Sequence, residues 1–103
     1  MHKREDINKI LQNFIAVVSV EFPIRSLYLF GSYAKNNAKD YSDIDIAVVS
    51  DKFEGSRFLD REKLGKYVIR ISSDIEVHPF RTEDFTEKDP FVKEIIETGL
   101  KIV

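Results

Sequence analysis

The chain contains no cysteine among its 103 residues, which excludes disulfide bonds, thiolate zinc sites and cysteine nucleophiles at once. It also lacks a long apolar run, so we expect neither a membrane-spanning helix nor a secretion signal. No charge of one sign dominates, because 16 basic and 18 acidic side chains leave a net charge of −2. Without a basic excess to hold a phosphate backbone, nucleic acid is not the expected partner. These absences favour a cytoplasmic protein with a small-molecule site.

The length and the apolar pattern predict one α/β or α+β domain with a small sheet over residues 1–103. Apolar residues at helical spacing, or in short and alternating runs, define helices at 4–20 and 57–70 and strands at 25–30, 42–50, 73–80 and 100–103. Asp89 before Pro90 is typical of a helix start. We expect Gly99 to end this last helix in the left-handed conformation.

The strand predicted from "SDIDIAVVS" (42–50) alternates acidic and apolar residues before it becomes wholly apolar. Successive strand side chains point to opposite faces, so Asp43 and Asp45 share a face at ~6.6 Å along the strand. Two carboxylates at this spacing repel each other, and aspartate is a poor strand former. A divalent cation would offset both costs, although any solvent-facing strand shows the same alternation.

A second acidic strand, "SDIEVHPF" (73–80), repeats the pattern and places Asp74, Glu76 and His78 on one face. If the two strands are neighbours, three or four carboxylates converge on the face opposite the core. Carboxylate clusters select hard cations such as Mg²⁺, which also takes substrate phosphates as ligands. A histidine beside a proline is more often structural, so the role of His78 stays open.

Gly31 and Ser32 follow the apolar run "RSLYLF", and Ser32 is a good N-cap for a short helix. A helix N-terminus presents free N–H groups to phosphate, and glycine lets the phosphate approach the backbone. The spacing matches neither the Walker nor the dinucleotide-binding glycine motif. Alone, Gly-Ser is also compatible with an ordinary turn.

The combined pattern is more specific: Gly31-Ser32, ten residues, and then Asp43-Ile44-Asp45. In "LFGSYAKNNAKDYSDIDIAVV" (29–49) the chain resembles the minimal nucleotidyltransferases of the polymerase-β-like superfamily. The likeness extends over the chain, including the third acidic strand and the ending "DPFVKEIIETGLKIV". Many members carry Ala-Arg-Gly where this chain has Ala-Lys-Asn, so Lys35 keeps the positive charge but not the bidentate fork of arginine.

The resemblance implies the nucleotidyltransferase fold, a small mixed sheet with helices on one side. It also implies transfer of a nucleoside monophosphate, AMP from ATP, to a hydroxyl group, with one or two Mg²⁺. Catalytic and metal-binding roles fall on Asp43, Asp45 and Glu76, with Asp74 as the alternative third acid. Nucleotide contacts fall on the loop before them, namely Gly31, Ser32, Lys35 and Ser42.

Family members as short as this one lack a substrate-binding domain of their own. We therefore expect a partner protein to supply the acceptor. The resemblance implies a small helical HEPN-type toxin, with this chain as the antitoxin that nucleotidylates it, within a homo- or hetero-oligomer. Two other hypotheses are a non-catalytic module that binds nucleotide or masks a partner, and an acidic structural domain without a site.

Overall fold

The computed structural model describes residues 2–103, so Met1, the first residue of the expected domain, lies outside the described residues. Helices and strands follow the predicted order along this part of the chain, except that no helix separates the first two strands. The elements are α1 (Arg4–Val18), β1 (Ser26–Phe30), β2 (Ile44–Val49), α2 (Arg57–Ile71), β3 (Ile75–Phe80), the 3₁₀ turn η1 (Thr82–Asp84), α3 (Pro90–Thr98) and β4 (Leu100–Lys101).

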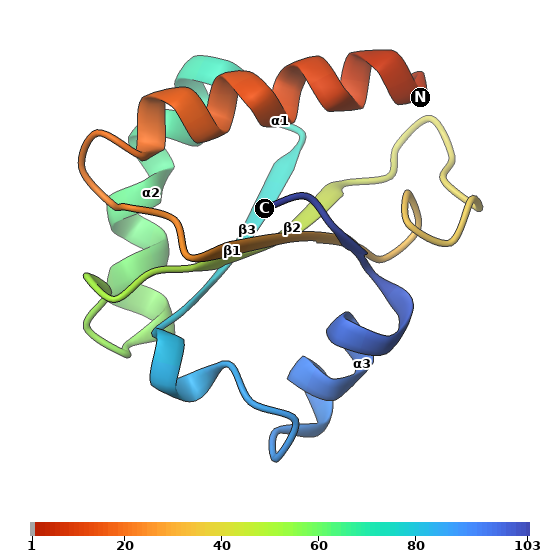
Figure 1. Cartoon of the computed structure of the whole chain (residues 1–103). Helices are drawn as coiled ribbons and strands as arrows, with labels where there is room; N and C mark the ends of the chain where they lie inside the picture. The colour runs from red at the N-terminus through yellow and green to blue at the C-terminus, as the bar shows by residue number, and fades with distance from the viewer. Residues whose placement is uncertain (1) are drawn as a thin grey trace.

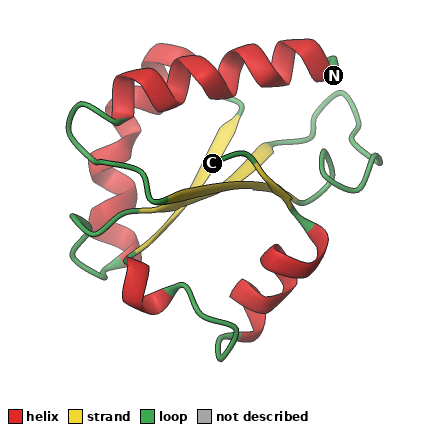
Figure 2. Ribbon diagram, viewed as in Figure 1, coloured by secondary structure: helices red, strands yellow, loops and turns green. Residues whose placement is uncertain are grey.

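The four strands form one mixed sheet in the order β3-β2-β1-β4. Figure 2 shows the strands in yellow, with helices above and below them. Strand β1 runs antiparallel to both β2 and β4, whereas β2 and β3 are parallel. Helix α2 supplies the crossover that a parallel pair requires. The expected α+β class with a small mixed sheet is confirmed.

Helices cover both faces of this sheet, which corrects the expectation of helices on one side. On β2, Ile44, Ile46 and Val48 point toward α1 and α2, while Ala47 and Val49 point toward α3. Figure 1 shows α1 and α3 on opposite sides of the strands. Helix α3 has apolar residues at helical spacing, and they pack against this second face of the sheet. The result is a second, smaller core.

Local sequence signals account for where the helices lie. Helix α1 buries Ile7, Leu11, Phe14 and Val18, a spacing that keeps one stripe on the core. The Asp89 side chain accepts a hydrogen bond from the Phe91 N–H, with proline at the first helical position, as predicted. None of the helices in residues 2–103 is long and apolar enough to cross a membrane.

Two local expectations are wrong. Residues 31–36 form turns rather than a helix, because Asn36 adopts a left-handed φ of 62° and ends the helical course. Gly99 does end α3, but in an extended conformation with φ −84°. Space explains the glycine here: an added Cβ would lie 2.5 Å from the Ile95 carbonyl oxygen and 3.0 Å from that of Leu29.

Candidate active site

The parallel register of β2 and β3 brings the predicted acidic residues together at one end of the sheet. Asp45 lies directly beside Glu76, and both side chains point to the face that carries α3. Asp43 and Asp74 precede their strands, since β2 begins at Ile44 and β3 at Ile75. The site is therefore built where two parallel strands begin.

Gly31 joins this site from the end of β1, because Phe30 pairs with Asp45 across the antiparallel ladder. The glycine has a φ of +74°, and an added Cβ would lie 2.5 Å from Asp45 Oδ2. Both the backbone conformation and the space exclude other residues. The Gly-Ser turn and the aspartate pair thus meet, although the turn is not a helix N-terminus and the dipole argument for phosphate does not apply.

The backbone of this turn is held by its own hydrogen bonds. The Lys35 N–H donates to the Gly31 carbonyl oxygen at 3.1 Å, and the Asn37 N–H donates to that of Ser32 at 3.0 Å. Ser32 itself is half-buried. The loop is ordered by backbone contacts, which leaves the serine side chain available to a ligand.

Crowding of carboxylates sets the electrostatics of the site. A hydrogen bond with Glu76 raises the pKa of Asp43, and burial together with the charges of Glu76, Asp45 and Asp74 raises it further. Burial raises the pKa of Asp45, and the Glu76 charge adds to this against the opposing effect of His78. Mutual repulsion of these carboxylates opposes their ionisation, and a bound cation would relieve it.

His78 is a half-buried neighbour of Asp45, with its Nε2 at 3.5 Å from Asp45 Oδ1. Its Nδ1 faces Nη2 of Arg57 at 3.0 Å, and a guanidinium group can only donate. Nδ1 is therefore the acceptor, which leaves the ring proton on Nε2, directed at Asp45. Burial lowers the pKa of His78 and favours this neutral form.

Aromatic rings fix this arrangement from the α3 side. Phe30 and Phe91 contact the His78 ring edge-on, with centroids at 5.0 and 5.8 Å. The Arg57 guanidinium lies 5.4 Å from the ring centroids of both Phe80 and Phe91. The sequence alone did not decide the role of His78. In the structure it packs between aromatic rings and lies next to Asp45 in the candidate site.

The two candidates for the third acid have different surroundings. Glu76 accepts from Arg61 Nη2 at 3.0 Å and lies beside Asp45, so it stays within the cluster. Asp74 is held 2.6 Å from His2 Nε2, on the side of the N-terminal segment. This geometry favours Glu76 over Asp74 as the third carboxylate.

Three residues of the loop that follows Gly31 have partners of their own. Lys35 Nζ lies 3.6 Å from Glu94 Oε1 on α3, an exposed pair. Ser42 Oγ accepts from the Lys39 N–H at 2.8 Å and caps a turn. The Tyr33 hydroxyl accepts from the His2 N–H at 3.1 Å, so its ring packs on the protein. The structure does not bring Lys35 or Ser42 into contact with the acidic cluster.

The donor set fits magnesium in its chemistry, because Asp43, Asp45 and Glu76 offer hard carboxylate oxygens. Across residues 2–103, however, no three such side chains are arranged as a ready metal cage. Mg²⁺ is commonly bound by one or two carboxylates, with waters and substrate phosphates completing its shell. Asp43 and Asp45 satisfy that smaller requirement.

Comparison with known proteins decides the family. The nucleotidyltransferase domain family matches residues 11–103. The chain belongs to this family. Its chemistry is accordingly nucleotidyl transfer, as the Gly-Ser and Asp-x-Asp pattern predicts. A relative from Methanocaldococcus jannaschii, provisionally named a protein adenylyltransferase, is 29% identical and aligned over 97% of each chain.

Solved structures share the fold. A provisionally assigned nucleotidyltransferase of Sulfolobus solfataricus superposes with a TM-score of 0.66 at 22% identity, covering 92% of this chain and 78% of that one. A toxin–antitoxin structure with AMP-PNP gives a TM-score of 0.62 at 22% identity, covering 95% and 73%. At these identities the likeness concerns the fold.

Sequence reasoning missed the basic and aromatic parts of the site. Arg57 and Arg61 are one helical turn apart in α2, a spacing that puts both on one face. That face meets β3, which carries Glu76 and His78. In the sequence, the i, i+4 spacing of the two arginines was the available signal. Their contact with Glu76 and His78 arises only because α2 is the crossover between the parallel strands β2 and β3.

Proposed function

We propose that this nucleotidyltransferase moves AMP from ATP onto a hydroxyl group of a partner protein, with Mg²⁺ as its metal ion. The observation that supports this proposal most directly is the close contact between Gly31 and Asp45. Asp45 in turn lies beside Glu76 on the neighbouring strand. In this reaction the acceptor oxygen bonds to the α-phosphorus, the bond to the β-phosphate bridge breaks, and pyrophosphate leaves. The hydroxyl proton passes to a carboxylate of the cluster, for which Glu76 is the candidate.

The residues of the chain divide this work between them. Asp43 and Asp45 would hold the ion, which supplies positive charge to the triphosphate and to the oxygens whose charge grows during transfer. Gly31 leaves room for a phosphate against the backbone, and Ser32 offers a hydroxyl donor. Lys35 stays a candidate for the phosphates, because its ion pair with Glu94 is exposed and easily exchanged.

Nucleotide binding is testable without an acceptor. We expect ATP with Mg²⁺ to raise the melting temperature of the wild type, by the equivalent of about 2.7 kcal/mol at roughly 100 times Kd. Asp45→Asn removes a metal-binding charge and should abolish the increase, whereas the exposed Asp6→Asn should retain it. Equal stabilisation of both variants, or none in the wild type, would contradict the proposal.

The partner is proposed from size and from the comparisons. The chain has no element beyond the sheet and its helices to hold an acceptor in residues 2–103, and one similar structure is a toxin–antitoxin complex. We infer a small helical HEPN-type toxin as acceptor, with this chain as its antitoxin. Tagged protein purified from its native host should recover such a partner repeatedly, and repeated failure would count against it.

A second candidate function has a specific observation behind it. Glu76 is engaged by Arg61 and by the Asp43 carboxyl, so the third acid is not free. A module that binds nucleotide, or that masks a partner without transfer, would tolerate this arrangement. Inhibition of the partner that is unchanged in Asp43→Ala and Asp45→Ala would favour this module over the enzyme.

A further inference from the structure

A cavity with a volume of about 670 Å³ lies outside the acidic site. It opens between the start of α1, the β1–β4 edge and the loop that follows Gly31. Leu29, on its floor, points to the α1 face of the sheet, whereas Asp45 and Glu76 point to the α3 face. The cavity is therefore a separate compartment, and the proposed transfer does not use it.

The floor is apolar. Ile7 comes from α1, Leu29 from β1, and Leu100 and Ile102 from the C-terminal edge. A volume of this size is typical of small-molecule sites, which are mostly apolar with a few placed polar groups. Such a floor would hold a hydrocarbon chain or a flat ring.

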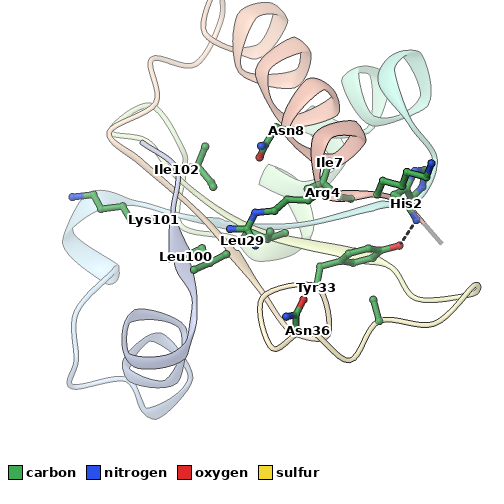
Figure 3. Close-up of a pocket in the computed structure, with 12 residues that line it drawn as sticks. His2, Arg4, Ile7, Asn8, Leu29, Tyr33, Asn36, Leu100, Lys101 and Ile102 are labelled. Atoms are coloured by element: carbon green, nitrogen blue, oxygen red, sulfur yellow. Dashed lines mark hydrogen bonds between the residues drawn. The ribbon is translucent and has the colours of Figure 1, made fainter.

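The polar groups at this cavity are cationic or neutral. Figure 3 shows the Arg4 side chain extending over the cavity toward Leu29, with Asn8 and Asn36 at its walls. Lys3 and Lys101 add positive charge at the rim, and no carboxylate from residues 2–103 lines the cavity. Among the ion pairs of residues 2–103, none involves Arg4. An arginine fork without a partner matches a carboxylate or phosphate oxygen pair.

One wall of the cavity is already shaped by contacts within the protein. His2 donates its backbone N–H to the Tyr33 hydroxyl, drawn as the dashed line in Figure 3, and its ring holds Asp74. The Asp74 carboxylate is thereby paired with His2. The Arg4 cation is left for a ligand from solution.

We propose that this cavity binds an organic anion with an apolar body, its carboxylate or phosphate on Arg4 and its body on Leu29 and Ile102. The size suits a fatty acid of medium chain length or a nucleoside monophosphate. Tyr33 and Asn36 line the cavity and belong to the loop that starts at Gly31. A ligand in the cavity would therefore contact that loop. This inference is independent of the transfer reaction.

The test uses the fluorescent anion anilinonaphthalene sulfonate on the full chain, with octanoate and AMP as competitors. We expect one bound dye per chain, with affinity at least about tenfold weaker in Arg4→Gln. Arg70→Gln removes an exposed arginine from α2 and should bind like the wild type. Ala38→Trp fills the cavity from its loop and should block the dye without altering the apolar floor.

Competition identifies the source of the anion. Displacement by octanoate points to an acyl carboxylate, and displacement by AMP in the Asp45→Asn variant points to a nucleotide. NMR shifts should centre on Leu29, Tyr33 and Ile102 rather than on Glu76. Dye binding that is unchanged in Arg4→Gln and Ala38→Trp, or a dye that neither competitor displaces, would overturn the proposal and leave the transferase proposal untouched.

Discussion

Gly31 and Asp45 are in such close contact that no side chain fits between them. A Cβ on residue 31 would lie 2.5 Å from Asp45 Oδ2 and 3.3 Å from Asp45 Cγ. The pairing of Phe30 with Asp45 across the β1–β2 ladder sets this distance. The Gly-Ser turn and Asp45, to which we assign phosphate and metal binding by proposal, are therefore one structural unit.

Gly31→Ala should damage both stability and activity. A left-handed φ costs a residue with a Cβ about 1–2 kcal/mol, and the methyl group also displaces the Asp45 carboxylate. We expect the free energy of unfolding to fall by that amount in urea titrations. Transfer by the folded fraction should fall as well, because Asp45 loses its position.

The matched control for this variant is Gly65→Ala. Gly65 lies inside α2 with open space around it, so alanine there should stabilise by about 0.5–1 kcal/mol. Wild-type stability and activity in Gly31→Ala would show that the close contact with Asp45 has no consequence.

Stability should depend on pH through the crowded carboxylates. The pKa values of Asp43 and Asp45 are raised above 3.8 by burial and by neighbouring carboxyls. A raised acid pKa means that the folded state holds the proton more tightly. Ionisation therefore removes stability as the pH rises from 3.8 through the folded pKa.

Asp45→Asn removes this effect at one position. We expect the variant to melt above the wild type at pH 7 without metal, and the difference to shrink as the pH falls toward 3.8. Thermal melts from pH 4 to pH 7 measure it. A variant that is less stable than the wild type at pH 7 would contradict the assigned repulsion.

His78 should act as a positioning residue for Asp45. Its Nε2 proton faces Asp45 Oδ1 at 3.5 Å while Arg57 holds the other ring nitrogen. His78→Leu keeps apolar bulk between the rings but removes the donor, so the transfer rate should fall about threefold to tenfold. His78→Gln, which retains a donor, should recover part of the rate, and equal rates in the two variants would argue for a packing role alone.

Asp60 is a stability determinant outside the site. Its buried carboxylate accepts hydrogen bonds from the Glu54 and Gly55 N–H groups, both at 2.9 Å. Asp60→Ala leaves these donors without a partner and should cost about 2–4 kcal/mol in denaturant unfolding. The exposed Glu62→Ala should cost far less, and a small loss at Asp60 would indicate that water replaces its carboxylate.

Local patterns are sufficient to predict much of the fold and part of the site. The Asp89-Pro90 start, the helical stripe from Ile7 to Val18 and the alternation around Asp45 follow from propensity and periodicity, which act over a few residues. The spacing of the motif residues and the two acidic strands together indicate one site for Gly31, Asp43, Asp45 and Glu76. The family pattern adds the chemistry that alternation alone could not specify.

What the sequence missed depends on tertiary arrangement. Gly99 ends α3 with extended backbone, and the close carbonyl oxygens of Ile95 and Leu29, rather than a left-handed cap, account for the glycine. The second core under α3 and the direction of Arg57 toward His78 arise only when β2 and β3 pair in parallel. No window of neighbouring residues contains that pairing.

The central claim is nucleotidyl transfer at the aspartate pair. Its most direct test is label transfer from ATP carrying ³²P at the α-phosphate, with Mg²⁺ and a co-purified HEPN-type partner, read on a denaturing gel. We expect label on the partner with the wild type and with Asp6→Asn, and none with Asp43→Ala or Asp45→Ala. Labelling that persists in both alanine variants would place the chemistry elsewhere and contradict this account.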